Sequence, residues 1–101
     1  NKVATVIRGV SKEIPKQINW ILRVDGHTDI TPLAETSKFE DNWELSQARA
    51  LSVVRYFMKN EKIESNRLAA TGFGQFQPID KGVSQLALAR NRRIELKLTE
   101  R

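Results

Sequence analysis

Apolar residues in this chain switch repeatedly between the spacing of a helix and the alternation of a strand, which limits the folds open to it. In chain order, the predicted elements are a helix at about 2–14, a strand at 19–25, a helix from 42 to about 60, a strand at 67–71, a short helix at 86–90 and a strand at 92–98. Strands with one apolar and one polar face need helices on the apolar face alone. The pattern therefore predicts an α/β two-layer sandwich, with a mixed sheet covered by helices on one face.

The predicted core lies where the apolar faces of these elements meet. Asp41 and Glu44 form a start to the long helix that is similar to a capping box. The residues expected to face the core are Trp20, Leu22 and Val24 in the first strand, Trp43, Ala50, Leu51, Val54, Phe57 and Met58 in the helix, and Ile94, Leu96 and Leu98 in the last strand. With 101 residues, 40% of them hydrophobic, the chain is expected to form a single domain at residues 1–101.

The composition narrows the possible classes of function. The chain has no cysteine, which excludes disulfides and thiolate metal sites. No apolar stretch is long enough to span a bilayer. The net charge is +5, and residues 90–101 carry five cations against two carboxylates, so three of the five net charges lie there. Because no aromatic residues are interleaved with this basic segment, the sequence does not favour nucleic acid as a partner.

Two polar motifs are predicted to meet at one end of the sheet. A loop at residues 26–41 follows the first strand and carries Asp29 near its start. The long helix then places Asn42 and Arg49 seven residues apart on one stripe, with the apolar Leu45 between them. A carboxylate and a guanidinium on neighbouring elements can bind the ammonium and the carboxylate of a zwitterionic ligand. The pattern therefore predicts a small-ligand site made by these side chains.

Each polar side chain also has an ordinary structural interpretation. Asp29 could cap a turn, and Arg49 could pair with a glutamate on the helix surface. Arg92 has the same parity as the inward residues of the last strand, so its guanidinium needs an anionic partner, either a carboxylate such as Asp29 or a ligand. We favour the structural pairing. Asn91 is expected to fix a turn, and His27 is expected to form hydrogen bonds in the loop.

The sequence does not favour catalysis. One histidine without cysteine gives no set of metal ligands and no pair with a nucleophile. Asp25 is expected on the outer face of its strand, so it does not form a catalytic carboxylate pair with Asp29. The turn at residues 72–74 lacks the lysine and the helix start of a phosphate loop. We therefore expect a binding module that is not an enzyme, with no catalytic residue, metal or cofactor.

Five motifs stand in order along the chain. They are Val24-Asp25-Gly26-His27-Thr28-Asp29, Asn42-Trp43-Glu44-Leu45-Ser46-Gln47-Ala48-Arg49-Ala50, Arg67-Leu68, Gly72-Phe73-Gly74 with Gln77-Pro78, and Asn91-Arg92-Arg93-Ile94-Glu95. Together they resemble the OmpA-like C-terminal peptidoglycan-binding domain over about residues 20–98. The long loop and the Asn-Trp-Glu-Leu-Ser sequence are more similar to the MotB branch of flagellar stators than to the outer-membrane porins. The resemblance implies a first strand of the βαβαβ fold upstream of Asn1.

The resemblance implies non-catalytic binding of peptidoglycan through the diaminopimelate of its stem peptide. In that family an aspartate and an arginine hold the amine and the carboxylate of diaminopimelate, and the matching positions here are Asp29 and Arg49. The other residues implied to line or support the site are Thr28, Asn42, Leu45 and Arg92. The resemblance also implies a longer parent protein, anchored upstream in the inner or outer membrane, in the periplasm and cell envelope of a Gram-negative bacterium.

The expected affinity of one site is modest, because two charge-assisted contacts of about 1.5–3 kcal/mol each must offset the cost of ordering the ligand. Firm anchoring would need several copies, so we expect a homodimer or a higher oligomer. The competing interpretation is a protein-interaction or assembly module of an envelope complex with a vestigial pocket. In that case the loop at residues 30–41 and the basic C-terminal segment would meet a protein partner.

Overall fold

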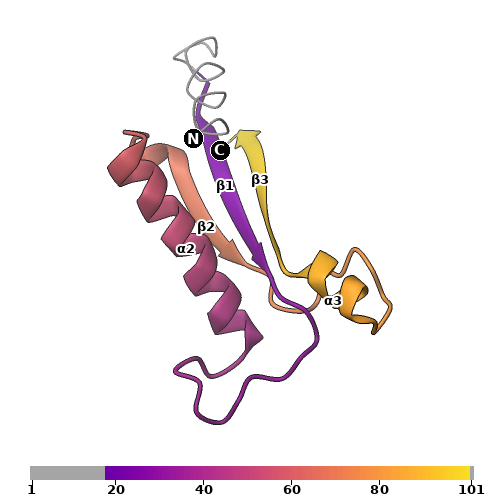
Figure 1. Cartoon of the computed structure of the whole chain (residues 1–101). Helices are drawn as coiled ribbons and strands as arrows, with labels where there is room; N and C mark the ends of the chain where they lie inside the picture. Colours follow the sequence, from indigo (N-terminus) through magenta and orange to yellow (C-terminus); the bar gives the residue numbers. More distant parts are fainter. Residues whose placement is uncertain (1–17, 101) are drawn as a thin grey trace.

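The computed structural model describes residues 18–100, which form a three-stranded sheet with one long helix packed against it (Figure 1). In chain order the elements are β1 (Trp20–His27), α2 (Asn42–Asn60), a 3-10 turn (Ser65–Arg67), β2 (Leu68–Gly72), α3 (Gln85–Asn91) and β3 (Arg93–Glu100). β1 is the central strand, with β2 parallel and β3 antiparallel to it. This mixed sheet confirms the predicted α/β fold class. The helix predicted at residues 2–14 lies outside the described residues.

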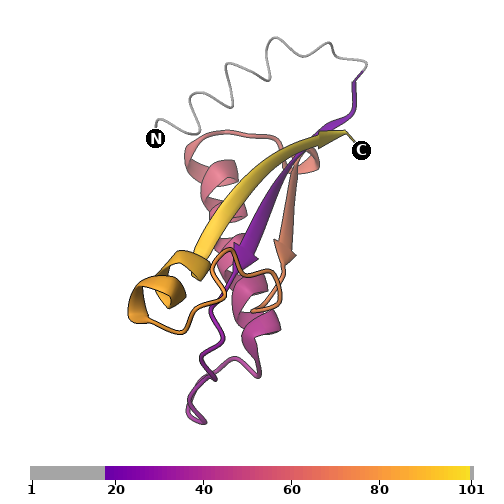
Figure 2. The same ribbon diagram turned by 90° about the vertical axis from the view of Figure 1, so that its right-hand side faces the viewer.

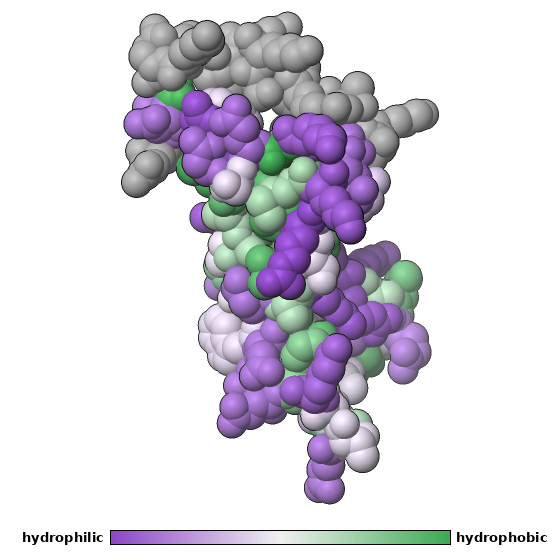
Figure 3. Space-filling model, turned by 90° about the vertical axis from the view of Figure 1, so that its left-hand side faces the viewer, coloured by the Kyte–Doolittle hydropathy of each residue, from purple (hydrophilic) through white to green (hydrophobic). Residues whose placement is uncertain are grey.

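α2 covers one face of the sheet and packs against β1 and β2 (Figure 1, Figure 2). The core between the helix and the sheet consists of Trp20, Leu22, Val24, Ala50, Val54, Phe57 and Ile63. Seen from the side of α2, the surface is mostly hydrophilic, with smaller apolar areas between the charged residues (Figure 3). The apolar stripe of α2 therefore packs on β1 and β2.

α2 begins as predicted, because the Asp41 side chain accepts a hydrogen bond from the Glu44 N–H at 2.9 Å. The prediction that Trp43 belongs to the core is wrong, since this residue is 50% exposed. The first turn of α2 extends beyond the ends of β1 and β2, so the sheet does not cover it (Figure 1). Within residues 18–100, no helix has both the length and the apolar character needed to cross a membrane.

α2 approaches the sheet closely where two glycines lie in the strands. A Cβ atom on Gly26 would overlap the carbonyl oxygen of Ser46, and one on Gly72 would lie 2.6 Å from the Gln47 nitrogen. β1 continues through Gly26 to His27, so the prediction that the loop begins at residue 26 is wrong by two residues. The close contact brings the end of β1 beside the first turns of α2.

β3 begins one residue later than predicted and is less buried. Leu96 packs against the core, but Ile94 and Leu98 are 38% and 49% exposed. A helix is about 10 Å wide and strands are about 4.8 Å apart, so one helix covers roughly two strands. α2 packs on β1 and β2, which leaves these positions of β3 outside its cover.

The face of the sheet opposite α2 carries a cluster of polar residues, Arg23, Asp25, His27, Arg93 and Glu95, here called the outer-face cluster. The Arg23 guanidinium donates two hydrogen bonds to the Asp25 carboxylate, at 2.7 and 2.9 Å. Arg93 donates one hydrogen bond, from its Nε, to the Glu95 carboxylate, also two residues along the strand. Asp25 is fully buried on this face, and Arg23 is the cation paired with its carboxylate.

His27 differs from its expected role. It lies at the end of β1 rather than in a loop, is 5% exposed, and stacks on Phe73 with ring centroids 5.1 Å apart. Neither ring nitrogen forms a hydrogen bond in the part of the chain that the structure describes, although Nε2 lies 3.8 Å from a Glu95 oxygen. Burial, with the nearby charge of Arg93, lowers the pKa of His27 below its ordinary value. The imidazole is therefore neutral at neutral pH.

Candidate functional site

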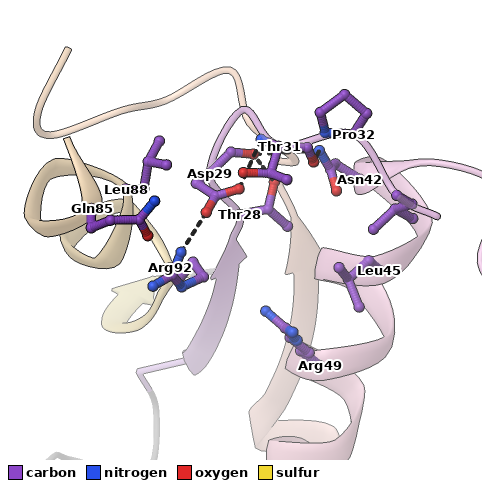
Figure 4. A pocket seen from close by; sticks show the side chains of 11 residues that line it. Thr28, Asp29, Thr31, Pro32, Asn42, Leu45, Arg49, Gln85, Leu88 and Arg92 are labelled. Atoms are coloured by element: carbon purple, nitrogen blue, oxygen red, sulfur yellow. Dashed lines mark hydrogen bonds and ion pairs between the residues drawn. The ribbon is translucent and has the colours of Figure 1, made fainter. Parts of the chain in front are cut away.

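A pocket of about 410 Å³ opens at the carboxyl end of β1, between the first half of α2 and α3 (Figure 4). Three segments line it: Thr28, Asp29, Thr31, Pro32 and Leu33 after β1, Asn42, Leu45 and Arg49 in α2, and Gln85, Leu88 and Arg92 in and just after α3. All six residues predicted for the ligand site therefore surround one cavity. They reach it from positions up to 64 residues apart, because β1, α2 and α3 all end or begin at this edge of the sheet.

Asp29 is held as an anion in the wall of the pocket. It is 6% exposed, and one carboxylate oxygen accepts the Thr31 N–H at 2.8 Å while the other accepts a guanidinium hydrogen bond from Arg92 at 2.6 Å. Burial opposes ionisation of Asp29, but these hydrogen bonds outweigh burial and keep its pKa below the ordinary value. Both structural roles considered for this residue, the turn cap and the pair with Arg92, are confirmed.

Arg92 reaches the pocket from a position that its strand parity did not predict. It follows α3 as the C-cap, where its N–H donates to the Leu88 carbonyl at 3.3 Å, and β3 starts only at Arg93. The helix end, rather than the alternation of the strand, aims its guanidinium at Asp29 (Figure 4). The side chain is 45% exposed, so part of the guanidinium remains open to solvent in the pocket.

Arg49 is the other cation of the pocket, and it has no partner. Its side chain is exposed and points from α2 into the space in front of Asp29 and Arg92 (Figure 4). It forms no hydrogen bond or ion pair with any residue of the described range 18–100. The alternative of a surface pair with a helix glutamate is therefore wrong for these residues. The pocket has two guanidinium groups for one carboxylate, which favours an anionic group in the ligand.

Asn42 connects the loop to the rest of the site. Its amide nitrogen lies within hydrogen-bond distance of the carbonyls of Asp29 and Thr31, at 3.3 and 3.2 Å, and of the Gln75 side-chain oxygen, at 3.0 Å. Asn42 is 7% exposed and sits at the start of α2. It therefore fixes the chain that carries Asp29, while its own oxygen accepts no hydrogen bond from the described residues.

Asn91 has the structural role that the sequence predicted. Its side-chain oxygen accepts the N–H groups of Ile79 and Asp80 at 2.9 and 3.0 Å, and its amide donates to the Asp80 carbonyl at 2.7 Å. Asn91 is 2% exposed and does not line the pocket. It ties the loop before α3 to the end of that helix.

The structure adds five lining residues that sequence analysis missed. They are Thr31, Pro32 and Leu33 in the loop and Gln85 and Leu88 in α3. The spacing of Gln85, Leu88 and Arg92, three and four residues apart, is that of one helix face and could have indicated the α3 wall. The loop residues give no such signal, because their positions follow from the hydrogen bonds of Asn42 and Asp29 rather than from a periodic pattern.

A family model described as the OmpA family matches residues 1–92. This chain belongs to the OmpA family. It is 37% identical over 75 residues to the uncharacterized protein YtxE of Bacillus subtilis and 31% identical over 78 residues to Motility protein B of the same organism. It is also 31% identical over 93 residues to the outer membrane protein Omp38 of Acinetobacter baumannii. These matches cover 74%, 77% and 92% of this chain but only 31%, 30% and 25% of the three relatives.

The fold of this chain is similar to those of solved MotB structures. A putative MotB-like protein from Desulfovibrio vulgaris matches 100% of this chain and 62% of its own, with 33% identity and a TM-score of 0.77. The C-terminal domain of Helicobacter pylori MotB matches 98% and 74%, with 25% identity and a TM-score of 0.77. The peptidoglycan-associated lipoprotein of Burkholderia pseudomallei shares the fold, at 22% identity and a TM-score of 0.70. The predicted similarity to the MotB branch is thereby confirmed.

Proposed function

We propose that this domain binds peptidoglycan without cleaving it, through the diaminopimelate head group of the stem peptide. The observation that carries the proposal is an unpaired guanidinium, Arg49, facing an ionised carboxylate, Asp29, across one pocket. The free end of diaminopimelate carries an ammonium and a carboxylate on one carbon, so its two charges need such a pair of opposite groups. The resemblance of the pocket motifs to the peptidoglycan-binding domain supports the same ligand.

Each charge of the head group has a matching position in the pocket. Arg49 would take the carboxylate, because its fork of N–H donors is not engaged by the described residues. The ammonium would approach the Asp29 carboxylate, which already shares one oxygen with Arg92. Arg92 would then hold Asp29 in position and, through its exposed part, add a second cation near the ligand carboxylate. The side-chain oxygen of Asn42 and the half-buried Leu45 would complete the contacts.

The proposal includes no catalytic step. The Asp29 carboxylate is paired with a guanidinium and has a lowered pKa, so it is an anion and a poor proton donor. Among residues 18–100, no group of three or more histidine, cysteine or acidic side chains could hold a metal ion. The chemistry of the site therefore fits recognition better than hydrolysis, and no cofactor is invoked.

The role of the whole protein is part of the proposal, since the chain spans less than a third of the relatives it matches. We place the domain in the periplasm, in the cell envelope of a Gram-negative bacterium, where it would anchor a membrane protein or a motor stator to the wall. The similarity to Motility protein B and to an outer membrane protein supports an envelope protein. Because one site is expected to bind modestly, several copies in a homodimer or higher oligomer would give firm anchoring.

Sedimentation with purified murein tests the proposal. Asp29→Ala and Arg49→Ala should each abolish cosedimentation, because each removes one of the two charges that hold the head group. Arg55→Ala is the matched control, since Arg55 is an exposed arginine on the same helix that does not line the pocket. Circular dichroism should be unchanged in all three variants. Retained binding in both pocket variants would reject the assignment and favour the protein-interaction module.

A further inference from the structure

An exposed pair of stacked aromatic rings lies at the start of α2 and in the turn after β2, and has no role in the core. Trp43 and Phe76, here called the aromatic pair, stack with ring centroids 4.9 Å apart and an interplanar angle of 29°. They are 50% and 54% exposed. Large exposed aromatic surface is costly in water, and on a small domain it commonly marks a binding surface.

The aromatic pair is held rigidly by the turn that follows β2. Gly74 has a φ of +62°, and a Cβ there would lie 3.3 Å from the Phe76 ring and 3.4 Å from the Trp43 ring, so both rings rest on the glycine. The Gly74 N–H donates to the Ser46 hydroxyl at 2.9 Å, and its carbonyl accepts the Thr28 N–H at 2.9 Å. The turn is thus fastened to both α2 and the end of β1, and the pair is formed before any ligand binds.

The hydrogen bond between Asn42 and Gln75 connects the pocket to the turn that carries Phe76. Gln75, between the turn glycine and Phe76, accepts a hydrogen bond from Asn42, which lines the pocket. A second cavity of about 480 Å³ is lined by Gln75 and the long loop and shares Pro32, Leu33 and Asn42 with the pocket. The aromatic pair itself lines neither cavity, but Trp43 directly follows Asn42 and Phe76 directly follows Gln75, so each ring is carried by the neighbour of a residue that lines the second cavity.

We propose that the aromatic pair is a subsite for the sugar rings of the glycan strand that carries the stem peptide. This inference rests on the proposed function. The apolar faces of pyranose rings pack against aromatic rings, and the amide nitrogen of Gln75, whose oxygen accepts from Asn42, can donate to sugar hydroxyl and acetamido groups. The glycan backbone is itself neutral, so it needs no additional ionic partner on this surface.

The covalent link between peptide and glycan limits how far the sugar can be from the pocket. Two or three extended residues span about 7–11 Å, and the diaminopimelate side chain between the peptide and its free end adds a few ångströms to this reach. Trp43 directly follows Asn42, so their Cα atoms are about 3.8 Å apart. A head group held beside Asn42 therefore keeps the sugars within reach of the aromatic pair, whereas a protein partner would have no such constraint.

Binding of the two halves of peptidoglycan, measured separately by calorimetry, tests the inference. The probes are soluble glycan strands freed of peptide, in a salt concentration that screens their free lactyl carboxylates, and a diaminopimelate stem peptide freed of sugar. Trp43→Ala and Phe76→Ala should each weaken glycan binding about three- to tenfold, as expected for one aromatic contact, and leave stem-peptide affinity unchanged. Trp43→Phe should retain most of the affinity. Tyr56→Ala, an exposed aromatic thirteen residues further along the same helix and not part of the stacked pair, is the matched control.

The unmodified chain provides a readout that does not depend on the folding of a variant. Trp43 is half exposed and Trp20 is 8% exposed, so bound glycan should protect the fluorescence of Trp43 from acrylamide quenching. Three results would contradict the subsite: glycan strands do not bind, bound glycan does not protect Trp43 from quenching, or both alanine variants bind glycan as tightly as the unchanged protein. The subsite would also be contradicted if these two variants changed only the self-association of the domain or its capture of another protein, and left glycan binding unchanged. If instead Arg49→Ala leaves stem-peptide binding intact, the proposed function fails and the glycan titration still decides the subsite.

Discussion

The pocket and the outer-face cluster contain the same kinds of charged groups but pair them differently. In the outer-face cluster, Arg23 binds Asp25 at 2.7 Å and Arg93 binds Glu95, each partner lying two residues along the same strand. In the pocket, Arg92 binds Asp29 at 2.6 Å across 63 residues of sequence, and Arg49 is left without a partner among the described residues. Balanced charges on a strand stabilise the sheet, whereas an unbalanced charge in a cavity is available to a ligand.

Substitutions in the two regions should therefore change different quantities, the free energy of unfolding or the affinity for ligand. Outer-face residues should act on the free energy of unfolding, since their pairs are internal and partly buried. Pocket residues should act on affinity, since the exposed guanidinium of Arg49 contributes no described contact to the fold. The distinction would be wrong if an outer-face variant changed ligand affinity, or if a pocket variant changed mainly the free energy of unfolding.

The largest expected effect is that of Arg49→Ala on ligand affinity. Loss of a charge-assisted contact of about 1.5–3 kcal/mol should weaken binding of a soluble stem peptide roughly tenfold or more. The free energy of unfolding should change by less than about 0.5 kcal/mol, because the side chain is exposed and unpaired. Titration calorimetry and urea denaturation measure the two quantities. A large loss of stability would mean that Arg49 has a structural partner.

Asp25→Asn should show the opposite pattern. It leaves the Arg23 guanidinium without its carboxylate on a buried part of the sheet, which should lower the free energy of unfolding by about 1–3 kcal/mol. Glu95→Gln is the matched control and should cost less, because the Glu95 side chain is 33% exposed and that of Asp25 only 1%. Stem-peptide affinity of the folded protein should not change in either variant. Weaker binding in Asp25→Asn would show that the two regions are coupled.

Arg92→Ala should move the acid limit of binding to higher pH. Burial raises the pKa of Asp29, while hydrogen bonds from Thr31 and Arg92 lower it further than burial raises it. Removing Arg92 raises this pKa, so Asp29 would become protonated, and lose the ligand ammonium, at a higher pH than in the unchanged protein. Stem-peptide affinity measured from about pH 3 to 7 gives the shift. Identical pH profiles would show that Arg92 does not control the charge of Asp29.

The smallest expected effect concerns His27 and the pH dependence of stability. Burial first, then Arg93, lowers its pKa in the folded state, while Glu95 and Asp25 act in the opposite sense and Lys97 in the same sense as Arg93. The unfolded chain then binds more protons as pH falls from about 7 through the ordinary histidine value near 6.5, so stability decreases until the lower folded pKa is reached. His27→Phe keeps a ring against Phe73 and should flatten this decrease in the free energy of unfolding. An unchanged slope in denaturation curves would exclude His27 as its source.

Sequence patterns predicted most of the fold because periodicity and capping act locally. The inward face of β1 and the start of α2 at Asp41 were both confirmed. Leu96 packs against the core as predicted, but Trp43, Ile94 and Leu98 are exposed, because their burial depends on where α2 begins and on how many strands it covers. Periodicity says which residues share a face, but it does not say whether another element covers that face.

The site could be predicted only in part, for the same reason. Asp29 and Arg49 were found because each stands in a recognisable local pattern, and the pocket does contain both. The α3 wall and the loop wall depend on tertiary contacts, such as the hydrogen bonds from Asn42 to the loop carbonyls. The roles of the pocket residues in binding remain predictions.

The most direct test of the central claim compares two stem peptides, one with free and one with amidated diaminopimelate, on the unchanged protein and on Arg49→Ala. If Arg49 holds the carboxylate, amidation should weaken binding to the unchanged protein about tenfold and have no effect on the variant, since the contact is already lost. An equal penalty for amidation in both proteins would show that the carboxylate binds elsewhere, and would contradict the account.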